Sequence, residues 1–97
     1  MPRKSNKPLQ PVANMAIGHH QAILFCTIST ELDTGLALSH LALSSNDPDK
    51  VARNTANAQR AYDAAQRWAR KLPPEYSKDL DDPFRQLKAN LEKLGRK

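Results

Sequence analysis

The chain has little of three residue types on which many functional sites depend. It contains one cysteine, Cys26, three glycines and 5% aromatic residues among its 97 residues. A single cysteine excludes an internal disulfide bond and any zinc site with several thiolate ligands. Three glycines leave no glycine-rich loop for binding phosphate. These absences argue against a disulfide-stapled secreted domain and a nucleotide-binding enzyme, and they favour a reducing compartment.

Long apolar runs are also scarce. The longest strongly apolar run is AILFC, at residues 22–26, whereas a helix that spans a bilayer needs about 20 apolar residues. Residues 1–14, MPRKSNKPLQPVAN, lack the apolar core of a signal peptide. We therefore expect a cytoplasmic protein with no membrane partner.

The formal net charge of +5 is distributed unevenly along the chain. Residues 1–12 carry +3 from Arg3, Lys4 and Lys7, whereas residues 13–48 carry −3 and contain neither lysine nor arginine. Residues 49–72 carry +4, and residues 73–97 carry +1. This asymmetry indicates a basic tail next to a helical region with one basic face. We expect residues 1–11 to form a flexible basic N-terminal arm and residues 12–97 to form a single helical domain.

Prolines divide this domain into three segments. Over residues 13–44, apolar residues recur at spacings of three, four and seven, which predicts one long helix. Its expected apolar stripe consists of Ile17, Ala22, Leu24, Phe25, Ile28, Leu32, Leu36, Leu38 and Leu43.

The second segment, residues 48–72, follows a strong helix-start signal. Asp47 is a good N-cap, and Pro48 is favoured at the first helical position. The inner stripe advances by alternating steps of four and three, as in a heptad seam. Its members are Val51, Thr55, Ala58, Tyr62, Ala65, Ala69 and Leu72.

The third segment, residues 82–94, begins with Pro83 in the first turn and is followed by Gly95, which we expect to cap its end. Leu80 is expected to close over its start. The fold class is therefore all-α. The simplest assembly is a three-helix up-down-up bundle built on a long antiparallel helical hairpin.

Residues 43–72, LSSNDPDKVARNTANAQRAYDAAQRWARKL, resemble a pattern found in small uncharacterised bacterial helical proteins. The resemblance covers about a third of the chain. It implies a bacterial origin, and it brings no activity, cofactor or site residue with it.

His19, Cys26, Asp33 and His40 lie seven residues apart and share one helix face. Seven residues correspond to about 10.5 Å of helical rise, whereas zinc ligands lie about 2.0–2.3 Å from the metal. We therefore expect no metal site on this helix alone; one assembled with another helix, or across a dimer, is the alternative. Cys26 has apolar neighbours, so we expect it to be buried and inert. No nucleophile, cofactor site or catalytic group is recognised, and the chain is not expected to be an enzyme.

Arg53, Arg60 and Arg67 are also seven apart, and they lie opposite the apolar seam. The favoured interpretation is a solvated face, in which Asp49 and Asp63, four residues earlier, pair with Arg53 and Arg67. The alternative is an anion-binding face that holds phosphate backbone together with the basic arm. The arm residues concerned are Arg3, Lys4 and Lys7.

Only two residues of the first predicted helix, Glu31 and Asp33, are charged. A helix covered on one side normally carries more charge on the other side. Either the second and third predicted helices together cover most of it, or part of it is covered by a second copy of the chain in a homodimer, with close approach at Gly18, Ala22, Cys26 and Ser29. The predicted function is a small non-enzymatic protein–protein interaction module with an unidentified partner. The alternative is a sequence-tolerant nucleic-acid-binding protein.

Overall fold

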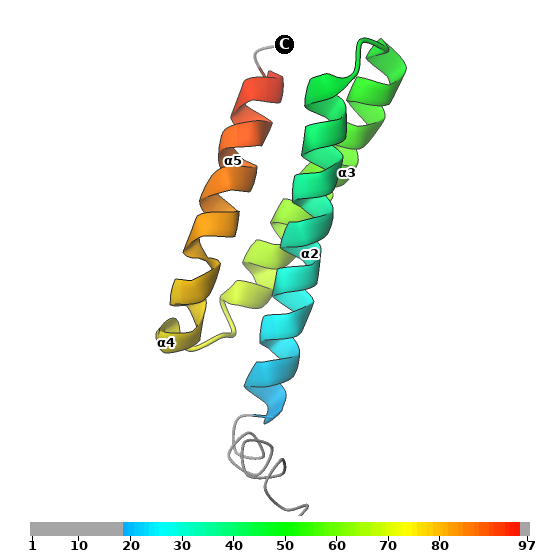
Figure 1. Cartoon of the computed structure of the whole chain (residues 1–97). Coiled ribbons are helices and arrows are strands. Elements are labelled where there is room, and N and C mark those ends of the chain that lie inside the picture. The colour runs from blue at the N-terminus through cyan, green and yellow to red at the C-terminus, as the bar shows by residue number, and fades with distance from the viewer. Residues whose placement is uncertain (1–18, 96–97) are drawn as a thin grey trace, which may run out of the picture.

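The computed structural model describes residues 19–95, and this part of the chain is all-α, with no strand among the described residues (Figure 1). Three long helices carry the fold: α2 spans His19–Ser44, α3 spans Pro48–Ala69 and α5 spans Asp81–Gly95. A short helix, α4 (Pro74–Ser77), and a 3-10 turn, Lys78–Leu80, connect α3 to α5. The predicted basic arm and the start of the first predicted helix lie outside the described residues.

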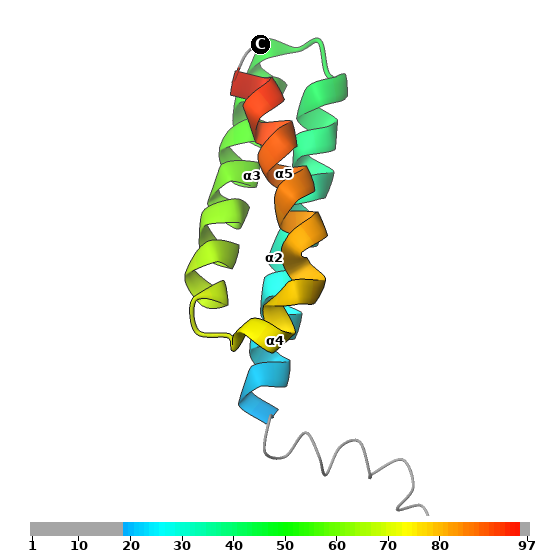
Figure 2. The same cartoon turned by 90° about the vertical axis from the view of Figure 1, so that its left-hand side faces the viewer.

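The long helices lie side by side. In both views α2 and α3 run in opposite directions and are joined by a short turn, while α5 runs in the direction of α2 (Figures 1 and 2). α4 lies at the end of the molecule opposite the α2–α3 turn. This arrangement leaves α2 in contact with both of the other long helices.

The start of α3 confirms the predicted boundary. Oδ1 of Asp47 accepts a hydrogen bond from the backbone N–H of Asp49 at 3.0 Å, and Pro48 occupies the first turn. The end of α3 differs from the prediction, because the helix ends at Ala69 and residues 70–72 form turns. Pro73 disfavours helical backbone in Leu72 and, because it has no N–H, it cannot continue the helical hydrogen bonds to the carbonyl of Ala69. Leu72 is nevertheless buried.

The third helix begins and ends one residue outside its predicted bounds. The predicted range was 82–94, whereas α5 spans Asp81–Gly95. The expected glycine cap is wrong, because Gly95 is the last helical residue and no glycine among the described residues has a positive φ. Leu80 is buried at the start of α5, as expected. Helix α4 was not predicted.

The core side of α2 differs in part from the predicted stripe. Leu24, Ile28 and Leu32 are buried as expected, whereas Phe25 and Leu36 are only half-buried. The buried seam continues through three small residues that an apolar pattern omits: Gly35, Ser39 and Ala42. Most of the seam predicted for α3 faces inward, with Ala58 and Ala65 buried, and Ala61 joins them.

At Gly35 the three long helices come into close contact. A Cβ atom at this position would lie 2.5 Å from Cδ2 of Leu87 on α5 and 3.3 Å from Cβ of Ala61 on α3. The contact also fixes the register of the hairpin, because it places Gly35 opposite Ala61. One turn further along α2, the Ser39 hydroxyl donates to the Leu36 carbonyl at 2.9 Å and accepts from Nδ2 of Asn90 at 3.0 Å. This buried pair links α2 to α5.

Candidate interaction surface on α2 and α3

Arg53, Arg60 and Arg67 are all exposed on α3, as the sequence predicted. The expected carboxylate pairs are not formed. Within residues 19–95 the one ion pair is Arg85–Asp82, at 2.8 Å on α5. Arg60 instead donates to the side-chain oxygen of Asn57.

Asp63 also has a partner other than an arginine. Its carboxylate accepts a hydrogen bond from Nε2 of Gln59 at 3.0 Å. The prediction that Asp49 and Asp63 neutralise the stripe is therefore wrong. Surface ion pairs are worth little, so ordinary side-chain entropy is enough to keep these groups apart.

A shallow groove of about 470 Å³ runs between α2 and α3. Two of the three arginines, Arg60 and Arg67, line it, whereas Arg53 lies beyond its end. The α2 wall contributes Glu31, Thr34 and Leu38. The groove thus combines an apolar strip with two guanidinium groups and two carboxylates, those of Glu31 and Asp63.

The outward face of α2, opposite the buried seam, consists of apolar and small polar side chains. Ile23 is 52% exposed and Leu41 is 57% exposed, which are the largest values among the large hydrophobic residues that the structure describes. Thr30, Thr34 and Ala37 lie between them and are also exposed. We call this set, Ile23, Thr30, Thr34, Ala37 and Leu41, the outward face.

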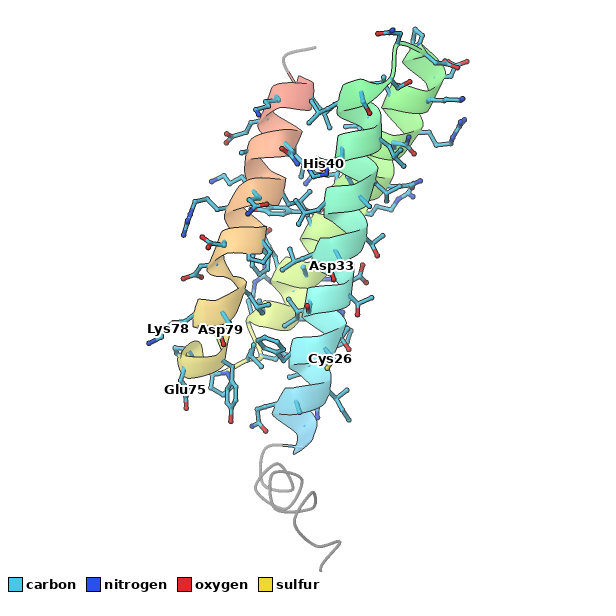
Figure 3. All side chains as sticks on the ribbon, in the orientation of Figure 1. Cys26, Asp33, His40, Glu75, Lys78 and Asp79 are labelled. Atoms are coloured by element: carbon cyan, nitrogen blue, oxygen red, sulfur yellow. The ribbon has the colours of Figure 1, made fainter. Side chains whose placement is uncertain are left out.

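Cys26, Asp33 and His40 lie along one edge of the outward face and are spread over the length of α2 (Figure 3). Cys26 is exposed, so the prediction of a buried thiol is wrong. It was based on apolar sequence neighbours, and those neighbours turn to other sides of the helix. No cluster of three or more metal-ligating side chains occurs in the described part of the chain.

A second groove, of about 400 Å³, lies between α3 and α5. Tyr62 and Phe84 line it and meet edge to face, with ring centroids 5.9 Å apart. Arg67 borders a further surface hollow beside Trp68, whose ring lies 5.0 Å from Nζ of Lys71. That cation–π contact covers one face of the indole. The hollow beside Trp68 gathers three basic side chains, Arg67, Arg70 and Lys71, whereas the second groove mixes aromatic, polar and charged groups.

Residues 19–95, which the structure describes, have no formal net charge. All 10 Asp and Glu residues, and ten of the 15 Lys and Arg residues, lie within residues 19–95. The other five basic residues are Arg3, Lys4, Lys7, Arg96 and Lys97. The net charge of +5 therefore belongs to the two terminal segments. The arginine stripe is a local feature of a neutral body.

By length and composition alone, residues His20–Ser44 of α2 are apolar enough to cross a membrane. The short apolar runs of the sequence did not indicate this property, because small and weakly polar residues separate the large hydrophobic ones. Only 28% of this window is buried in the structure. α3 and α5 thus leave the outward face of α2 uncovered.

No protein-family model matches the chain, and neither the curated proteins nor the solved structures contain a match.

Proposed function

We propose that the protein is a small non-enzymatic interaction module that binds another protein through the outward face of α2 and the adjoining α2–α3 groove. The observation that carries this proposal is the exposure of Ile23 and Leu41, 52% and 57%, on a helix with only two charged residues. Soluble monomers rarely leave large apolar surface uncovered. A helix that is apolar on nearly all sides is normally covered on nearly all sides.

The geometry supports a protein partner of helical or extended shape. Ile23 and Leu41 are 18 residues apart, which is about 27 Å and five turns of helix. They therefore point in the same direction at the two ends of one strip. The proposal also includes the finer description of the fold, a three-helix up-down-up bundle built on the α2–α3 hairpin, and a cytoplasmic location in a bacterial cell.

A lipid bilayer is the alternative environment for an apolar helix, and two features of α2 argue against it. Glu31 and Asp33 lie near the middle of the window, where an aspartate costs about 2.5–3.5 kcal/mol on insertion scales. The seam that includes Leu24, Ile28 and Leu32 is already packed in the core with residues of α3 and α5. Insertion would require this core to open.

The test is site-specific photo-crosslinking in cells. A photoreactive amino acid replaces Ala37 on the outward face or, as the control, Lys88 on the exposed side of α5. We expect protein adducts from position 37 and none from position 88. Equal labelling from both positions, or none from position 37, would contradict the proposal. Recovery in the membrane fraction without an adduct would favour a bilayer as the cover.

A second candidate function is binding of nucleic-acid backbone without sequence preference. The observation that favours it is that Arg53, Arg60 and Arg67 are exposed and have no carboxylate within ion-pair distance among the described residues. If all three contact phosphate, the affinity for a random duplex should fall with salt, with a log–log slope of about −0.9 for each contact. A titration at low and physiological salt measures this slope. Binding that does not change between these salt concentrations would exclude it.

A further inference from the structure

We propose that the partner on the outward face of α2 is α2 of a second copy, packed parallel to it about a two-fold axis that runs along the helices. This inference rests on the proposed function and names its partner. In such a dimer each α3 helix also contacts the α2 helix of the other copy. The two α2 helices form the centre, and the two α3 helices flank them on opposite sides.

The first argument comes from the directions in which α2 presents its side chains. At 100° per residue, Ile23, Thr34 and Leu41 point within about 20° of one another. The groove residue Leu38 lies about 60° to one side of Ile23 and Leu41, and Asp33 lies about 80° to the other side. The surface of α2 thus has three adjacent parts: the groove toward its own α3, the strip of Ile23, Thr34 and Leu41, and an edge with Asp33.

The second argument is charge complementarity. α2 has two carboxylates and no lysine or arginine, whereas α3 carries the arginine stripe. Arg60 and Arg67 line the open groove, on the side where a second α2 helix would lie. Glu31 and Asp63 share that groove, yet within residues 19–95 no ion pair joins either carboxylate to an arginine. The guanidinium groups therefore remain available for a carboxylate of another chain.

The register of the hairpin brings the opposite charges to the same level. Gly35 lies opposite Ala61, so Asp33, two residues earlier on α2, lies at the level of Asp63 on the antiparallel α3, whose carboxylate already accepts a hydrogen bond from Gln59. That level falls between Arg60 and Arg67. A parallel second copy has the same levels along the helix axis, so the second copy's Asp33 faces these two arginines.

The same geometry selects the parallel arrangement. A two-fold axis along the helices places the two α3 helices on opposite sides of the α2 pair, and each then meets the Asp33 edge of the other copy. A two-fold axis across the helices would place both α3 helices on one side. The two arginine stripes would then face each other, and such like-charge contacts cost several kcal/mol.

The test combines charge reversal with solution mass. We expect the wild-type protein to have the mass of two chains at high micromolar concentration. Asp33→Arg should weaken the dimer at least about tenfold, because it sets like charges together, and so should Arg60→Asp. The double variant Asp33→Arg with Arg60→Asp should restore the dimer. Glu92→Arg, an exposed charge reversal on α5, is the matched control and should leave the mass unchanged.

A second measurement checks the orientation of the two copies. In a Cys26→Ser background, Thr34→Cys should form a disulfide-linked dimer on mild oxidation, because equal positions meet in a parallel pair. Lys88→Cys on α5 should remain monomeric. A wild-type mass of one chain, a double variant that stays dissociated, or no link through position 34 would each overturn the inference. If photo-crosslinks from position 37 then contain a different protein, the proposed function stands and the second copy is excluded as the partner.

Discussion

Gly35 determines how closely the three long helices pack, and it gives the first prediction. Leu87, which an alanine Cβ would meet at 2.5 Å, is fully buried and cannot move into solvent. We therefore expect Gly35→Ala to lower the free energy of unfolding by about 1–3 kcal/mol, although alanine favours helix by about 1 kcal/mol. Urea denaturation measures the change. Gly95→Ala is the control, because nothing lies within 4 Å of its added methyl group; equal midpoints for the two variants would show that the contact is easily relieved.

The buried pair of Ser39 and Asn90 predicts an asymmetric response. Ser39→Ala removes the oxygen that accepts from the Asn90 amide, and an unpaired buried donor costs about 1–3 kcal/mol. Asn90→Leu should cost less, because the Ser39 hydroxyl still donates to the Leu36 carbonyl. Thermal unfolding of the two single variants and the double variant tests this order. A larger loss for Asn90→Leu would indicate that shape, rather than hydrogen bonding, dominates the site.

At the scale of single residues, the sequence predicted the burial of large side chains better than that of small ones. Leu24, Ile28 and Leu32 were expected in the core and are buried there. Ser39 and Gly35 were missed, because their role depends on close approach by Asn90 and Leu87 from a segment about 50 residues away in the sequence. No local pattern indicates such a contact. Nearly the whole circumference of α2 is apolar, so periodicity alone did not identify its core side.

At the scale of the helices, the N-cap residue Asp47 gives a prediction about the stability that α3 provides. Its carboxylate accepts from the backbone N–H groups of Asp49 and Lys50, at 3.0 and 3.5 Å. We expect Asp47→Ala to destabilise the protein by about 0.5–2 kcal/mol, and Asp47→Asn to be nearly neutral because asparagine caps equally well. Chemical denaturation of both variants measures the difference. Equal losses would mean that the charge of Asp47, and not its capping bond, supports α3.

The helices show where sequence signals are reliable. The start of α3 was predicted to the residue because Asp47 and Pro48 act locally. The ends were less accurate, since the turns at residues 70–72 and the helix α4 depend on how the chain returns to bring Leu80 and α5 against the core. The exposed position of the arginine stripe followed from spacing. The spacing did not predict the groove that contains Arg60 and Arg67, because the position of the groove depends on the register of α2 against α3.

Over the whole molecule, residues 19–95 carry no net charge whereas residues 1–18 and 96–97 are basic, and this separation allows a test that decides between the two candidate functions. Two variants remove the same number of positive charges from the full chain: Arg3→Ser, Lys4→Ser and Lys7→Ser in one, and Arg53→Ser, Arg60→Ser and Arg67→Ser in the other. They differ only in where the charge is lost. Any difference in their retention by a polyanion therefore reports location and not total charge.

We expect the variant of residues 3, 4 and 7 to elute from heparin at clearly lower salt than the variant of the arginine stripe. The reason is that the stripe belongs to a body with as many acidic as basic groups, all 10 of its Asp and Glu included, so its field is compensated within about one Debye length, roughly 8–10 Å. The terminal segments carry no such compensation. If the variant of the arginine stripe instead eluted at lower salt, the stripe would be an organised anion-binding site. Nucleic-acid binding would then be the better explanation for the basic face of α3.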